Sequence, residues 1–165
     1  MRALLWFCLL LPAAVRADAA PAEAFKPMAF LAGHCWKGAF PNKPLTEEHC
    51  FEWVYDGRFL RDRHKVRGDG QPDYLGETIY YWDAAAKQIQ FLYIENQGGV
   101  SKGSVAAAND GLVFPPASYV DDEGQEQTYR SHWQRNGDGA YEAVNEFKTK
   151  DGWVVAWKVL MQKQP

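Results

Sequence analysis

The chain has 165 residues, 47% of them hydrophobic, and its formal net charge at pH 7 is −3. This length suits a single domain that is large enough to bury a hydrophobic core. A mildly acidic chain without a cluster of Lys and Arg is a poor match for nucleic acid, so no nucleic-acid partner is expected.

The N-terminus has the pattern of a secretory signal peptide. Arg2 supplies a positive charge, residues 3–15 form an uncharged apolar run, and an Ala-Asp-Ala cleavage motif ends at Ala19. The apolar run is shorter than the roughly 20 residues that a membrane-spanning helix needs, and no later segment is expected to cross a membrane. The sequence therefore predicts a signal peptide of residues 1–19 and an exported, periplasmic or secreted domain of residues 20–165.

Strand character dominates the expected mature chain. A short helical lead, "AEAFKPMAFLAG", ends at Gly33. Beyond it, runs of Tyr, Trp, Phe, Val and Ile alternate with turn clusters every 8 to 14 residues or so, which is typical of an antiparallel barrel or sandwich. No helix-sized connection separates the runs, which excludes a parallel sheet. About ten strands are expected, at residues 34–40, 45–55, 58–67, 74–82, 88–95, 100–107, 111–115, 126–135, 140–148 and 153–162.

The first hairpin predicts a disulfide. If "PNKP" is its turn, Cys35 lies opposite Cys50 and Trp36 lies opposite His49. Directly opposite residues in a strand pair are close enough for a disulfide bond, and an exported chain with two cysteines favours one. Successive side chains of a strand face opposite sides, so His34 is badly placed to activate Cys35 as a nucleophile.

The second hairpin fixes the inward face. The Asp-Gly turn after Tyr55 is a strong two-residue hairpin signal, and it pairs His49 with His64. The two registers agree. They place opposite charges on one face together with the disulfide, and they leave an apolar set that must point inward, namely Trp36, Phe51, Trp53 and Leu60.

The same inward face carries four polar residues, namely Glu47, His49, Asp62 and His64. One interpretation is a histidine pair with a carboxylate that binds a metal or moves a proton. The other is that these residues line a wet barrel mouth or satisfy one another. We favour the second, because a one-residue bulge would scatter the set. Accordingly we expect neither a tightly bound metal nor a cofactor.

The C-terminal strands continue the alternation. In the last strand we expect one inward set, consisting of Trp153, Val155, Trp157, Val159 and Met161. In the strand before it, the matching set is Tyr141, Ala143, Asn145 and Phe147. The 126–135 strand is ambiguous: apolarity favours Tyr129, Ser131 and Trp133 inward, whereas a strict two-residue "NG" turn would place Arg130 and His132 there.

Four stretches carry a resemblance to a known family, namely "FLAGHCWKG", "DGRFLRDRH", "YLGETIYYWDAAAKQI" and "EFKTKDGW". They look like an uncharacterised bacterial lipocalin-like (calycin-type) family, distantly similar to nitrobindins and fatty-acid-binding proteins. The resemblance implies a ten-strand, up-and-down antiparallel barrel around a cavity. The usual Gly-x-Trp opening is one residue longer here, between Gly33 and Trp36. Haem is not expected, because the haem-binding relatives use a histidine near the C-terminus and none follows His132.

These observations lead to an exported lipocalin-like barrel that binds a small apolar or amphipathic molecule in its interior. Trp36 is expected to close one end. The interior candidates for ligand contact are His49, His64, Asp62, Glu47, Trp53, Phe51, Tyr141, Asn145 and Trp157. The alternatives are a metal- or proton-transfer enzyme using His49, His64 and Asp62, and an envelope scaffold without a ligand. The sequence leaves the ligand and the oligomeric state open, and no residue is assigned a catalytic role.

The exported protein is expected to begin near Ala20, because the cleavage motif ends at Ala19. It is also expected to carry the Cys35–Cys50 disulfide, because the two cysteines lie opposite each other in the predicted hairpin. Intact mass, measured with and without reductant, checks both parts. A mass with two free thiols would contradict the bond and the hairpin register together.

Overall fold

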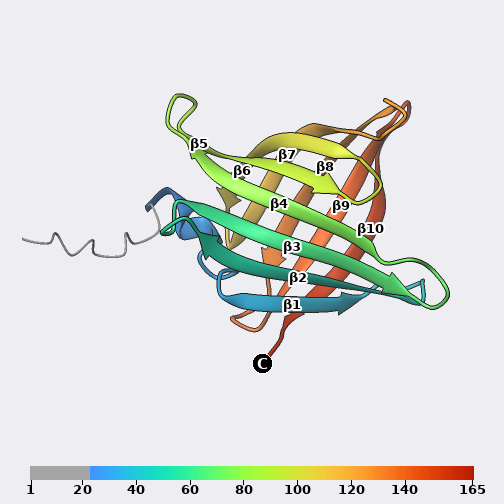
Figure 1. Cartoon of the computed structure of the whole chain (residues 1–165), viewed down its shortest axis with the longest axis horizontal. Coiled ribbons are helices and arrows are strands. Elements are labelled where there is room, and N and C mark those ends of the chain that lie inside the picture. Colours follow the sequence, from blue (N-terminus) through green and yellow to red (C-terminus); the bar gives the residue numbers. More distant parts are fainter. Residues whose placement is uncertain (1–22) are drawn as a thin grey trace, which may run out of the picture.

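The computed structural model describes residues 23–165 as one closed β-barrel with a short helix at one end (Figure 1). The expected signal peptide lies outside the described residues. The elements are a 3-10 helix η1 (Glu23–Met28) and the strands β1 (His34–Ala39), β2 (Leu45–Val54), β3 (Phe59–Gly68), β4 (Tyr74–Asp83), β5 (Gln88–Glu95), β6 (Val100–Ala108), β7 (Gly111–Val120), β8 (Glu126–Arg135), β9 (Ala140–Thr149) and β10 (Gly152–Lys163).

The strand order is up-and-down. Each strand pairs antiparallel with the next, and β1 pairs antiparallel with β10 to close the barrel. Closure leaves no free sheet edge, which removes the main risk of edge-to-edge association. The expected fold class, a ten-strand antiparallel barrel with a short helical lead, is confirmed.

The predicted hairpin registers are confirmed. Cys35 pairs with Cys50 across β1 and β2, and the two form a disulfide. His49 pairs with His64 across β2 and β3. On the outer face Arg61 donates to Glu52, as expected for opposite charges on adjacent strands.

The end of the barrel beside η1 is filled with apolar side chains. Phe25, Met28 and Leu31 are buried there, together with Trp36, which is 1% exposed. The indole Nε1 of Trp36 donates a hydrogen bond to the carbonyl of Leu31 at 3.3 Å. Burial of each of these side chains contributes about 1.5–3 kcal/mol. The helical lead therefore plugs this end of the barrel.

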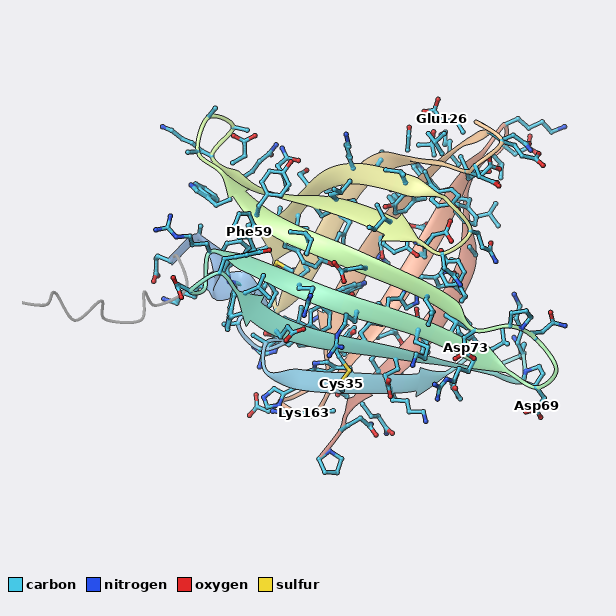
Figure 2. The ribbon with its side chains drawn as sticks, viewed as in Figure 1. Cys35, Phe59, Asp69, Asp73, Glu126 and Lys163 are labelled. Carbon is cyan, nitrogen blue, oxygen red and sulfur yellow. A yellow bond between two sulfur atoms is a disulfide. The ribbon has the colours of Figure 1, made fainter. Side chains whose placement is uncertain are left out.

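The two ends of the barrel differ. Phe59 marks the end that η1 covers, whereas Asp69, Asp73 and Glu126 mark the loops at the opposite end (Figure 2). We call these the closed end and the loop end. No helix in the described residues 23–165 is long and apolar enough to cross a membrane.

Strand β7 is longer than expected. The sequence predicts a strand over residues 111–115, which would end at the first of two prolines that have no N–H to donate to a sheet. It continues to Val120, and its register against both β6 and β8 shifts by one residue around Pro115 and Pro116. A bulge at the two prolines removes the need for their missing donors and lets the strand continue.

In β10 the predicted inward face is wrong for Trp153 and Val155. The register against β9 shifts between Val155 and Trp157, so the alternation changes phase at this bulge. Trp157 packs against the core, and Val159 and Met161 are buried as predicted. Trp153 pairs with Lys148 instead, and the Arg130 guanidinium lies 4.5 Å from its ring centroid.

The ambiguity in β8 is resolved in favour of the apolar face. Ser131 and Trp133 are buried, whereas Arg130 points outward and donates to Glu146 at 2.6 Å. The connection to β9 spans residues 136–139 and is longer than a two-residue turn, so the register that would have turned Arg130 inward does not form.

Trp36→Ala is expected to lower the free energy of unfolding by about 3–5 kcal/mol, because it leaves a large cavity beneath the plug. Urea denaturation measures the change. Trp153→Ala is the matched control: on the outer face it should cost about 1 kcal/mol or less. Equal losses in the two variants would contradict the assignment of the closed end.

Candidate ligand-binding cavity

The barrel interior holds a partly open cavity of about 400 Å³. Its wall is mostly aromatic, and the aromatic side chains that line it are Phe40, Tyr74, Tyr80, Phe91, Tyr93, Phe114, Tyr119, Tyr129, Trp133, Phe147 and Trp157. Phe40, Tyr74 and Phe147 lie near the strand ends away from η1, so the cavity extends toward the loop end. An apolar chamber with one polar region is the usual form of a small-molecule site.

Six of the predicted interior candidates line this cavity, namely Glu47, His49, Asp62, His64, Asn145 and Trp157. The other three belong to the apolar packing instead. Phe51 and Tyr141 are buried in the core, and Trp53 packs edge-on against Phe25 of η1 at 5.5 Å. All three face inward as predicted, but they lie near the closed end, where η1 and its neighbours fill the interior.

Glu47, His49, Asp62 and His64 form the polar cluster of the cavity wall. Glu47 and His49 are two residues apart on β2 and so face the same side, while His64 is the cross-strand partner of His49 on β3. Asp62 pairs with Phe51 and is therefore diagonal to His49, within reach of its ring. Two adjacent strands thus supply the whole cluster.

The side chains of the polar cluster converge closely. Nδ1 of His49 lies 2.6 Å from Oδ2 of Asp62, and Nε2 of His49 lies 3.2 Å from Oε1 of Glu47. Nε2 of His64 lies 3.0 Å from the same Glu47 oxygen, although its direction is unsuited to a hydrogen bond. The two imidazole rings stack with centroids 4.4 Å apart and planes 8° from parallel.

Burial and pairing act in opposite directions on this cluster. Burial alone would raise the pKa of Glu47, but the hydrogen bond from His49 and the close contact and charge of His64 outweigh it and lower that pKa to about 2. Burial alone would lower the pKa of His49, but the charge and hydrogen bonds of Asp62 and Glu47 outweigh it and raise that pKa to about 10. At neutral pH, Glu47 and His49 therefore form an ion pair.

Several buried atoms of the polar cluster lack a hydrogen-bond partner within the protein. They are Oε2 of Glu47, Oδ1 of Asp62 and Nε2 of His64. Oδ1 of Asn145, which also lines the cavity, has no partner either. Such atoms cost about 1–3 kcal/mol each when they remain unpaired. The polar cluster therefore has free capacity toward a molecule inside the cavity.

Tyrosines on β4, β5 and β8 were not predicted to belong to the site. The hydroxyls of Tyr74 and Tyr93 lie 2.5 Å apart, and Tyr129 is hydrogen-bonded to Ser101 at 2.9 Å. Burial raises the pKa of Tyr74 to about 12, so its hydroxyl keeps its proton. Gly76 pairs with His64, and this register decides which residues of β4 face inward. The register could not be predicted, because the loop between β3 and β4 has five residues and does not match a tight hairpin turn.

No known protein-family model matches this chain, and no curated protein matches it. The class is therefore defined by the structure alone: a closed, ten-stranded antiparallel β-barrel with an internal, mostly aromatic cavity and one polar cluster.

The stability of the protein is expected to depend on pH through the polar cluster. His49 has a pKa raised from 6.5 to about 10, so its stabilising contribution is complete below pH 6.5 and is lost as the pH rises toward 10. Glu47 has a pKa lowered from 4.5 to about 2, so its contribution is present above pH 4.5 and is lost as the pH falls toward 2. Urea denaturation across this range should show greatest stability between pH 4.5 and 6.5.

The variant His49→Gln is the control for the alkaline limb. It removes the titrating ring, so its stability should decline less between pH 6.5 and 10 than that of the wild type. Parallel pH profiles of wild type and variant would show that another group causes the decline.

Proposed function

We propose that this chain is an exported, lipocalin-like barrel that holds a small apolar or amphipathic molecule in its interior. One observation carries the proposal: a mostly aromatic cavity of about 400 Å³ contains one polar cluster whose buried atoms are incompletely paired. The apolar body of a ligand would contact the aromatic wall, and its polar end would meet the polar cluster.

The dimensions and lining of the cavity support this function. Small-molecule sites have volumes of about 300–1,000 Å³ and combine apolar walls with a few polar groups. Phe91, Phe114 and Trp133 form a continuous aromatic wall, with ring centroids 6.1 and 4.7 Å apart in the two successive pairs.

Export is supported by the disulfide. Cys35 and Cys50 are joined on the outer face of the first hairpin, and such bonds form and persist in oxidising compartments. The resemblance to lipocalin-like proteins supports the interior site instead, since it implies a barrel that surrounds a cavity.

Binding of the neutral fluorophore N-phenyl-1-naphthylamine tests the proposal. The mature protein is expected to bind one molecule per chain, with the blue-shifted and enhanced emission of an apolar site. Val66→Trp should weaken this binding about tenfold or more, because Val66 lines the cavity and the larger ring fills the space.

Lys65→Trp is the matched control. Lys65 neighbours Val66 on β3 and faces outward opposite Glu48, so binding should be unchanged. Absence of saturable binding to the wild type, or equal effects of the two substitutions, would refute an interior site.

A further inference from the structure

The polar cluster has the arrangement of a metal site. The Nε2 atoms of two histidines, from adjacent strands, approach a single oxygen of Glu47 at 3.2 and 3.0 Å. One donor atom from each of Glu47, His49 and His64 lies within 4.8 Å of the others. Against the expectation from the sequence, we propose that these three residues bind one divalent transition-metal ion of the Zn²⁺ type, with Asp62 as a positioning residue.

The distances suit a tetrahedral ion. Zinc binds imidazole nitrogen at about 2.0–2.1 Å and carboxylate oxygen at about 2.0–2.2 Å, so two donors at tetrahedral positions are about 3.4 Å apart. The two nitrogen–oxygen separations in the polar cluster are only a few tenths of an ångström shorter. A small outward rotation of the Glu47 carboxylate and a tilt of the stacked rings would admit the ion between the three donors.

Asp62 completes the arrangement. A histidine that binds metal through one nitrogen usually donates the other N–H to a carboxylate, which fixes the tautomer and the ring orientation. Nδ1 of His49 lies 2.6 Å from Oδ2 of Asp62, and the Asp62 side chain is 1% exposed. This contact leaves Nε2 of His49 as the atom directed toward Glu47 and the metal.

Charge and pairing also support an ion at this position. Glu47 is 2% exposed, and its Oε2 has no partner within the protein, so the contacts among the four residues do not satisfy the cluster. When the ion binds, the proton on Nε2 of His49 leaves to solvent and its lone pair joins the metal, while Nδ1 keeps its hydrogen bond to Asp62. The two positive charges of the ion then balance the two buried carboxylates.

The donor set selects the class of metal. Two imidazole nitrogens and one carboxylate suit Zn²⁺ and related transition-metal ions rather than Mg²⁺ or Ca²⁺, which prefer oxygen ligands. Three protein donors leave a fourth position, which would face the aromatic cavity. Only this last consequence rests on the proposed function: a ligand in the cavity would complete the coordination with its polar end.

Metal titration of the full mature chain tests the site. Protein freed of metal by chelator and dialysis is titrated with Zn²⁺ by calorimetry, and with Co²⁺ by visible absorption, which reports tetrahedral coordination. One equivalent should bind per chain. Glu47→Gln and His64→Gln should each weaken binding by about tenfold or more, because each removes a ligand. His132→Gln, which changes an exposed histidine of β8, should bind like the wild type.

Asp62→Asn distinguishes positioning from a merely structural role. Loss of a carboxylate behind a ligating histidine typically costs about 10–100-fold in metal affinity while the stoichiometry is kept. Circular dichroism of each variant shows whether it folds. The proposal is overturned if the folded wild type binds less than one equivalent, or if His64→Gln binds as tightly as His132→Gln. Fluorophore binding without metal reports separately on the cavity, so either proposal can fail alone.

Discussion

The arrangement of the interior depends on one constraint, the cross-strand register of β1, β2 and β3. The disulfide between Cys35 and Cys50 holds this register from the outer face. Because neighbouring side chains of a strand face opposite sides, the same register directs Trp36 and His49 inward, and it pairs His49 with His64. A slip of one residue would move all of these side chains to the other face of the sheet. The covalent bond outside and the polar cluster inside therefore belong to one arrangement.

The position of an inward residue along the barrel axis decides whether it packs in the core or lines the cavity. At the closed end η1 and its neighbours fill the interior with apolar side chains, and inward residues such as Phe51 and Tyr141 serve the core. Farther toward the loop end nothing from η1 reaches the interior, and inward residues line a cavity instead. Glu47 and His64 occur at this depth, where Glu47 is buried and the two histidines outweigh the effect of burial and lower its pKa, but where space remains for another molecule. The single plug thus determines which inward residues are available for binding.

Two bulges adapt the regular barrel to this interior. In β7 the shift at Pro115 and Pro116 allows a strand with two missing donors to stay in the sheet. In β10 the shift before Trp157 turns that ring toward the cavity and leaves Trp153 outside, beneath Arg130. Both bulges change the phase of the alternation within a strand. They therefore shape the wall of the cavity without changing the order of the strands.

Much of this protein was determined by local sequence. Turn residues and alternating aromatic runs were sufficient for the ten strands, the antiparallel class and the disulfide, because hairpin registers depend on short loops and on a strict period of two. Four of the predicted interior polar residues, from Glu47 to His64, could be grouped for the same reason. The change of inward face within β10 could not be predicted, because the residues around the bulge at Ala156 have no composition that distinguishes a bulge from a regular strand.

Tertiary structure alone decided how the inward residues are used. An inward side chain packs against η1 or lines the cavity according to its depth in the closed barrel. This depth cannot be predicted from the local sequence pattern. The partners of His49 were decided in the same way. The diagonal contact across β2 and β3 brings Oδ2 of Asp62 to 2.6 Å from Nδ1 of His49, and Glu47 supplies the carboxylate between the two histidines. The sequence determined that the polar cluster lies on the inward face of the first two hairpins. Closure of the sheet brings ten strands and one helix around a common interior. This closure decided that the polar cluster is buried beside a cavity.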